Sequence, residues 1–284
     1  MKTIIITLLT ALCFGFMNEI PVMTLQEAMN KKLTEVNIVS LGSYQGESVI
    51  MEIKNLSTKP LRINVEPGRV LKAPDDKYQN LLIVQGRQFI MKPNGSSAER
   101  LNAFCCESND AGPAQNLKYK PHQLADSSLV KLASYVHTNK SSLGTNSIQQ
   151  AIWAISNKHA TAAITISNEK ELNMKHLVAQ LKNEPVPWYI IKQKVYQLQN
   201  GRIHLVNDTL EGKMAYTSSG WTYSKLNIYD PKDNGVLISI GSWLKPGINN
   251  TYPVNIDVKK LPKGKYKLTL EDEKQIFTQK DIEI

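Results

Sequence analysis

The side chains with the clearest chemical potential in this sequence are two adjacent thiols, Cys105 and Cys106. Neighbouring Cα atoms lie about 3.8 Å apart, whereas disulfide-bonded cysteines prefer about 5.5 Å, so a bond between these two would be strained. A zinc site would need further ligands nearby, and the five histidines show no His-Glu-x-x-His spacing. We therefore expect no metal and no cofactor, and the two thiols need another explanation.

Two short segments offer that explanation. Residues 103–107 read AFCCE, and residues 147–153 read SIQQAIW. An aromatic-Cys pair followed by a Gln-x-Ala-Ile-Trp helix resembles the thioester domains of bacterial surface adhesins, over residues 100–160. In that family a Cys thiol condenses with a Gln amide, ammonia leaves, and a nucleophile on a partner surface then attacks the thioester. The resemblance implies that Cys105 supplies the thiol and Gln149 the amide.

The same segments leave alternatives open. Cys106 is a possible substitute for the thiol and Gln150 for the amide, because each is adjacent to the first choice. The family's Leu-Pro-x-Thr-Gly wall anchor is missing, since Leu261–Gly264 reads LPKG. A second interpretation makes Cys105 and Trp153 ordinary core residues, because a free cysteine buries well as a small hydrophobe.

The last 60 residues carry a resemblance of their own. Residues 226–230 read LNIYD, and residues 261–268 read LPKGKYKL after Gly235. This pattern is similar to the immunoglobulin-like and type IX sorting modules at the ends of exported bacterial proteins. The resemblance covers residues 225–284 and implies a small β-sandwich. Sorting modules commonly end in a basic strand, whereas Lys280–Ile284 has mixed charge.

The N-terminus is typical of an export signal. Lys2 precedes an uncharged apolar run over residues 4–16, which is shorter than the roughly 20 residues of a membrane span. Cys13 follows Leu12, where a lipoprotein site needs a small residue, so we expect no lipid anchor. We interpret residues 1–16 as a signal peptide and expect a secreted, periplasmic or cell-surface protein without a membrane span.

Alternation and capping patterns indicate the elements that position these residues. Val49, Met51 and Ile53 alternate with polar neighbours, as in a strand with one buried face. Thr24 and Glu27 form a capping-box pattern at the start of a short helix. Three further helices are expected before residue 184, the second capped by Asn146 or Ser147 and the third by Asn168. The alternating Tyr266, Leu268 and Leu270 predict a late strand.

The chain length of 284 residues, divided by about 150 residues per domain, favours two domains. An apolar fraction of 42% excludes wholesale disorder. We expect a mainly β protein with a helical subdomain (α+β), built from two β-sandwich or barrel-like domains. The first covers residues 17–187 and carries a three-helix insert at about 115–184; the second covers residues 188–284, after the linker at Pro185–Pro187.

The rest of the sequence gives no positive sign of enzymatic turnover. No phosphate loop, Gly-x-Gly-x-x-Gly or Gly-x-Ser-x-Gly motif is present. The net charge of +9 is moderate, and the lysines between 259 and 267 fit a solvated strand face better than a nucleic-acid interface, which needs aromatic residues on the same side. We expect an exported surface or extracellular protein that binds a protein or glycan without catalytic turnover and has no nucleic-acid partner. The sequence does not determine its oligomeric state. The alternatives are a covalent thioester adhesin and a secreted hydrolase with an unrecognised site.

Overall fold

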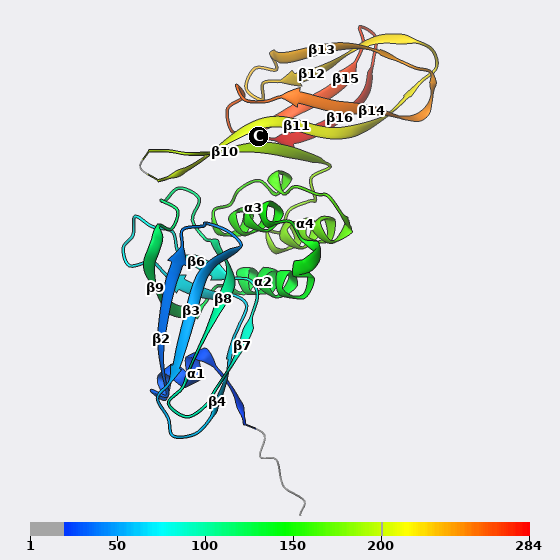
Figure 1. Ribbon diagram of the computed structural model, residues 1–284. Helices are drawn as coiled ribbons and strands as arrows, with labels where there is room; N and C mark the ends of the chain where they lie inside the picture. The colour runs from blue at the N-terminus through cyan, green and yellow to red at the C-terminus, as the bar shows by residue number, and fades with distance from the viewer. Residues whose placement is uncertain (1–19, 200) are drawn as a thin grey trace, which may run out of the picture.

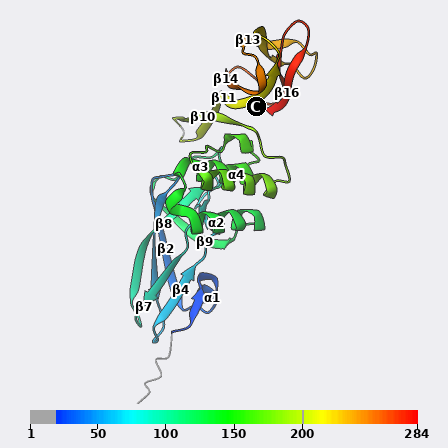
Figure 2. The ribbon, with the colours of Figure 1, turned by 90° about the vertical axis from the view of Figure 1, so that its right-hand side faces the viewer.

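The computed structural model describes residues 20–199 and 201–284 (Figure 1). It is mainly β, with 48% strand and 19% helix, which confirms the predicted fold class. A barrel lies at one end of the molecule, three helices lie in the middle, and a sandwich lies at the other end, as a second view also shows (Figure 2). The expected signal peptide, residues 1–16, falls outside the described residues.

Six strands close the N-terminal barrel in the order β2-β3-β8-β6-β5-β9. Their bounds are β2 (Thr34–Leu41), β3 (Glu47–Asn55), β5 (Arg69–Lys72), β6 (Leu81–Ile83), β8 (Ser96–Cys105) and β9 (Gln115–Leu124). The predicted alternation of Val49, Met51 and Ile53 is confirmed, because all three are fully buried in the barrel core. Burying one face of each strand in this way closes the sheet around a single apolar interior.

A small three-stranded sheet packs against the barrel in the order β1-β4-β7. It consists of β1 (Val22–Thr24), β4 (Leu61–Val65) and β7 (Arg87–Met91), and α1 (Leu25–Asn30) follows β1 directly. The predicted capping box of α1 is confirmed: the Glu27 N–H donates to Thr24 Oγ1 over 3.1 Å, and the Thr24 N–H donates to Glu27 Oε2 over 2.8 Å. The cap fixes the point where strand changes to helix.

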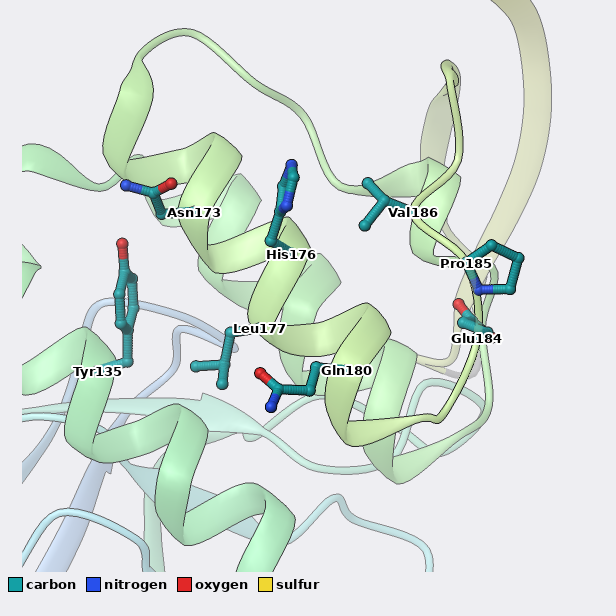
Figure 3. A pocket seen from close by; sticks show the side chains of 8 residues that line it. All are labelled: Tyr135, Asn173, His176, Leu177, Gln180, Glu184, Pro185 and Val186. Carbon is teal, nitrogen blue, oxygen red and sulfur yellow. The ribbon is translucent and has the colours of Figure 1, made fainter.

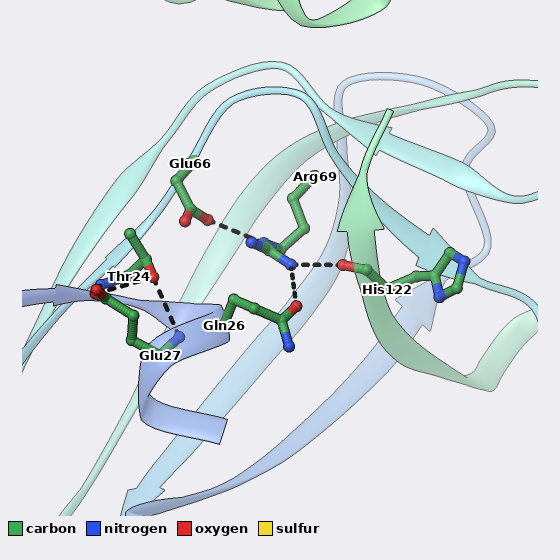
Figure 4. A network of polar contacts seen from close by, with 6 residues as sticks. All are labelled: Thr24, Gln26, Glu27, Glu66, Arg69 and His122. Carbon is green, nitrogen blue, oxygen red and sulfur yellow. Dashed lines mark hydrogen bonds and ion pairs between the residues drawn. The ribbon is translucent and has the colours of Figure 1, made fainter. Parts of the chain in front are cut away.

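A buried arginine ties α1 to the barrel wall (Figure 4). The Arg69 side chain is 2% exposed, and its Nε donates to Glu66 over 2.9 Å. Its Nη1 donates to Gln26 Oε1 over 3.2 Å and to the His122 carbonyl on β9. One guanidinium thus satisfies acceptors from three separate segments, as its fork of donors allows.

The helical region comprises α2 (Ser127–Asn139), α3 (Thr145–Ser156) and α4 (Glu169–Leu181), with short 3₁₀ turns η1 (Lys140–Ser142) and η2 (Thr161–Ala163). The predicted start near residue 115 is wrong, because 115–124 form β9. There, Tyr119 is buried in the barrel core, and β9 pairs with β2 and β5. The cap predicted for α4 at Asn168 is confirmed, whereas α3 is capped at Gly144 and not at Asn146 or Ser147.

The C-terminal part is a sandwich of two antiparallel sheets, ordered β10-β11-β14 and β13-β12-β15-β16. The bounds are β10 (Tyr189–Gln197), β11 (Ile203–Ser218), β12 (Thr222–Tyr229), β13 (Val236–Leu244), β14 (Gly247–Asp257), β15 (Lys265–Glu271) and β16 (Ile276–Glu283). Tyr266, Leu268 and Leu270 point into its core, as predicted. The domain boundary near residue 187 stays a prediction.

Candidate functional site

The two residues singled out for thioester chemistry lie in contact. Cys105 is the last residue of β8, and Gln149 lies on the second turn of α3. The Cys105 N–H donates to Gln149 Oε1 over 3.2 Å, and Gln149 Nε2 donates to the Cys105 carbonyl over 2.8 Å. The Cys105 N–H also reaches the Tyr44 carbonyl at 3.0 Å. The amide therefore docks on the backbone of Cys105, although 44 residues separate the two in sequence.

The two thiols enter different cores. Cys105 belongs to the barrel core, whereas Cys106 belongs to the core between β8 and the helices. Successive side chains of a strand point to opposite faces, which accounts for the separation. Burial raises the pKa of both thiols, and for Cys105 the neighbouring Cys106 and Glu107 raise it further. Both cysteines are therefore protonated at neutral pH.

The second amide, Gln150, makes different contacts. Its Oε1 accepts from the Thr165 N–H over 2.9 Å and from Thr165 Oγ1 over 3.0 Å. Adjacent helix residues point about 100° apart, so Gln150 cannot share the environment of Gln149. Of the two amides, the structure brings only Gln149 to a cysteine backbone.

Trp153 lies one turn after Gln149 and is 2% exposed, as predicted. Its ring stacks on Tyr44, with centroids 6.4 Å apart and planes 8° from parallel. It reaches the barrel core and packs there with Cys105. Trp153 therefore anchors on the barrel the same helix that carries Gln149.

A buried carboxylate fixes the start of that helix. Glu171 on α4 is 2% exposed, and its Oε1 accepts from the Gly144 N–H over 2.8 Å and from the Ser147 hydroxyl over 2.9 Å. Its Oε2 accepts from the Ser167 N–H. Burial alone would raise the pKa of Glu171, but these hydrogen bonds, first from Gly144 and then from Ser167, lower it overall. A carboxylate at a helix N-terminus also complements the helix dipole.

One polar pair was missed by the sequence reasoning. The Ser108 hydroxyl lies 2.9 Å from His159 Nε2, and the Ser108 N–H donates to Asn157 Oδ1. Burial, followed by the charges of Lys263 and Lys182, lowers the pKa of His159 to about 4. Ser108 is only 1% exposed, so a substrate has no access to its hydroxyl. The two residues are 51 positions apart in the sequence, so no local pattern could have paired them.

Two hollows flank the segment that joins the helices to the sandwich. The smaller, of about 570 Å³, lies between α2, α4 and residues 184–186, and its lining includes Tyr135 and His176 (Figure 3). The larger, of about 1250 Å³, lies between the helical region and the sandwich. Its lining combines charged residues of both signs with aromatic rings: Lys158, Asp230, Lys265, Lys267, Trp188 and Tyr266. We call this larger hollow the interdomain cleft, after the domain boundary predicted near residue 187.

Comparison of the chain with protein-family models, with curated proteins and with solved structures finds no match. Across residues 20–199 and 201–284, no helix has the length and apolarity to cross a membrane. In the same part of the chain, no three His, Cys, Asp or Glu residues come together as a metal site would require.

Proposed function

We propose that this chain is an exported protein that binds a ligand at the cell surface or outside the cell, without turnover. The interdomain cleft carries the proposal. Ligand sites are concave, often lie at domain interfaces and have volumes of roughly 300–1,000 Å³; the cleft, at about 1250 Å³, is somewhat larger. The export part of the proposal rests on the basic and apolar N-terminal sequence.

The lining of the cleft favours a ligand with both donors and acceptors. Lys158 comes from the helical region, whereas Lys267 and Asp230 come from the sandwich. Trp188 adds a partly exposed aromatic ring, and Tyr266 also lines the cleft although it is only 6% exposed. Mixed charges beside aromatic rings suit a glycan or a protein loop, each of which offers hydroxyl or amide groups and apolar faces.

The proposal of binding without enzymatic turnover rests on the burial and protonation of the candidate nucleophiles. Ser108 and His159 form the arrangement nearest to a nucleophile and its base, yet Ser108 is 1% exposed and neither residue lines the interdomain cleft. Both thiols are buried and hold their protons. A nucleophile in this state is poorly suited to repeated attack on a substrate.

Binding to glycan and protein arrays tests the proposal. The double variant Lys158→Glu/Lys267→Glu reverses charge on both sides of the cleft and should abolish the array signals of the wild type. The matched control is Lys118→Glu, a lysine on β9 of the barrel that is also exposed. If the wild type binds nothing on either array, or if the double variant binds as the wild type does, the cleft is not the binding site.

A second candidate function is covalent attachment through Cys105 and Gln149, favoured by the contact of the Gln149 amide with Cys105. In this reaction the Cys105 thiol adds to the Gln149 carboxamide carbon, ammonia leaves and a thioester forms. An amine or hydroxyl on a partner then attacks the carbonyl, and the Cys105 thiol is released. The amide must first give up its two hydrogen bonds to the Cys105 backbone.

Intact mass spectrometry of the purified chain decides this second candidate. The thioester form is lighter by one ammonia, and treatment with methylamine adds one methylamine to Gln149 and frees a thiol. Gln149→Ala should have its full calculated mass, whereas the matched controls Gln150→Ala and Cys106→Ala should still lose ammonia. A wild-type chain of full calculated mass, unreactive toward methylamine, would rule out the covalent mechanism and leave the cleft proposal intact.

A further inference from the structure

The outer face of one sheet of the sandwich carries two exposed aromatic rings. In this sheet β12 and β13 are neighbours, on the side of the sandwich farthest from the barrel (Figure 1). Tyr223 on β12 lies directly opposite Trp243 on β13, and the two are 52% and 65% exposed. The next residues along each strand, Ser224 and Leu244, are buried, so both rings point away from the core. The ring centroids are 5.5 Å apart and the planes meet at 67°, so the rings form a corner.

A glycine gives the Tyr223 ring its place. Gly241 lies two residues before Trp243, on the same face of β13. A Cβ atom on Gly241 would lie 2.0 Å from Tyr223 Oη and 2.8 Å from Tyr223 Cζ. The Tyr223 ring therefore extends from β12 onto β13 and fills the space that a side chain at residue 241 would need. A larger residue at this position would displace the ring.

A charged pair continues the same face beside the rings. Lys225 is exposed and lies between Gly241 on β13 and Glu271 on β15, opposite both. Asn227 Nδ2 donates to Glu271 Oε1 over 2.6 Å, and the Tyr229 hydroxyl donates to the same oxygen. Neither Lys225 Nζ nor Glu271 Oε2 has a hydrogen bond or ion pair within residues 20–199 and 201–284. An ammonium donor and a carboxylate acceptor are therefore available next to the rings.

We propose that this surface, which we call the aromatic ledge, binds a neutral saccharide chain. The ledge consists of Tyr223, Lys225, Gly241, Trp243 and Glu271. The C–H face of a sugar ring is apolar and packs on an aromatic ring, whereas its hydroxyl groups both donate and accept hydrogen bonds. Residues two apart on a strand lie about 6.8 Å from each other, so the rings and the charged pair can contact neighbouring sugars of one chain.

Charge and composition favour a neutral saccharide over other occupants. The charges of Lys225 and Glu271 cancel, so the ledge has no net attraction for an anionic saccharide or for the headgroups of an anionic membrane. The next residues on the same face are Ser239, Asn227 and Thr269, which lie opposite one another on three strands. They are polar, whereas the buried centre of a protein interface is mostly apolar. Aromatic rings beside hydroxyl, amide and paired charged groups complement a sugar chain.

The ledge is a second site and is separate from the interdomain cleft. None of its five residues lines the cleft. An open surface contacts few ligand atoms, so we expect a dissociation constant of about 0.1–1 mM. With ordinary association rates, such a complex dissociates in well under a second and is lost when an array is washed. Arrays therefore report on the cleft, and binding to the ledge has to be measured in solution.

Saturation-transfer difference NMR of the purified chain with cellohexaose, chitohexaose or mannohexaose, each up to about 5 mM, tests the proposal. The wild type should bind at least one of them. Trp243→Ala should weaken this binding by about tenfold or more, as for loss of an aromatic hot spot. Gly241→Ala keeps both rings but displaces Tyr223, and should weaken binding by about threefold or more. The matched control is Tyr196→Ala on β10 of the other sheet, because Tyr196 is 49% exposed, and it should bind as the wild type does.

Four results would overturn the proposal. The first is a wild type that binds none of the three hexasaccharides, including one that binds phosphatidylglycerol vesicles instead. The second is tighter binding of the anionic hexagalacturonate than of any neutral hexasaccharide. The third is binding that Trp243→Ala or Gly241→Ala, each shown to be folded by circular dichroism, leaves unchanged.

The fourth result is loss of hexasaccharide binding in Lys158→Glu/Lys267→Glu, which would place the saccharide in the interdomain cleft. We expect this double variant to bind the hexasaccharides as the wild type does, and Trp243→Ala to keep the wild-type array signals. Failure of the ledge and failure of the cleft are thus separate readouts.

Discussion

Replacing Trp153 tests how α3 is held on the barrel. The side chain is 2% exposed, lies in the barrel core with Cys105 and stacks on Tyr44. Trp153→Ala removes the whole indole from this packing. Because the barrel wall on one side and α3 on the other restrict collapse into the space, most of the lost volume should remain as a cavity.

The expected cost follows from burial and from the indole N–H. Large-to-small changes of a buried aromatic residue cost about 3–5 kcal/mol in the free energy of unfolding. This is a large part of the roughly 5–15 kcal/mol that stabilises a typical domain. The Trp153 Nε1 is buried without a hydrogen-bond partner among the described residues. Trp153→Phe therefore loses no hydrogen bond and should cost only about 1–2 kcal/mol.

Urea denaturation followed by far-ultraviolet circular dichroism measures both changes without depending on tryptophan emission. Trp221→Ala is the matched control, because Trp221 is 69% exposed and its removal should change stability by less than about 0.5 kcal/mol. A loss under about 1 kcal/mol for Trp153→Ala, or a loss equal to that of Trp221→Ala, would refute the assignment of Trp153 as the anchor of α3.

Three further changes probe the polar interior. Glu171→Gln should lower the free energy of unfolding, measured by urea denaturation, by about 2–3 kcal/mol, because it weakens the hydrogen bonds that hold the start of α3. Folding lowers the pKa of Glu171, so the wild type should be the more stable protein above the unfolded carboxyl pKa and should lose this difference as the pH falls through the folded pKa. The pKa of His159 falls to about 4 on folding, so the free energy of unfolding should decrease by about 1–3 kcal/mol between pH 6.5 and pH 4. Thermal denaturation of His159→Gln should show a smaller decrease over the same pH range. Arg69→Met should lower the free energy of unfolding by about 2–4 kcal/mol, because it leaves the Glu66 carboxylate unpaired. Adding Glu66→Leu should restore much of this stability. A double variant no more stable than Arg69→Met would contradict the importance of the ion pair.

Short sequence patterns correctly predicted those parts of the fold that depend on contacts between residues near one another in the chain. The capping box of Thr24 and Glu27 joins groups three residues apart, and Asn168 caps α4 through the N–H of Glu171, again three residues away. Strand alternation likewise reports which face of a strand is buried, as Met51 and Leu268 illustrate. In each case the deciding contact, or its period, lies within a few residues of the chain.

The errors occurred where the deciding contact is distant in sequence. Residues 115–124 carry few apolar side chains, and their strand exists because β2 and β5 pair with them on either side. The N-cap of α3 is Gly144, which has no side chain to cap the helix; Glu171, 27 positions away, supplies the acceptor instead. Neither partner can be recognised before the topology brings it near.

The position of Gln149 follows from the same non-local contacts and explains why its two interpretations share one geometry. Trp153 holds α3 on the barrel, and Glu171 on α4 fixes the start of the helix, so the amide between these two points has little freedom to move away from Cys105. As a structural bridge, the amide satisfies a backbone N–H and a backbone carbonyl in a buried place. As a reactant, it is held beside the residue that carries the thiol, and fixed proximity lowers the barrier to bond formation. The packing of α3 is therefore necessary for either role, and only the chemistry of the isolated chain separates them.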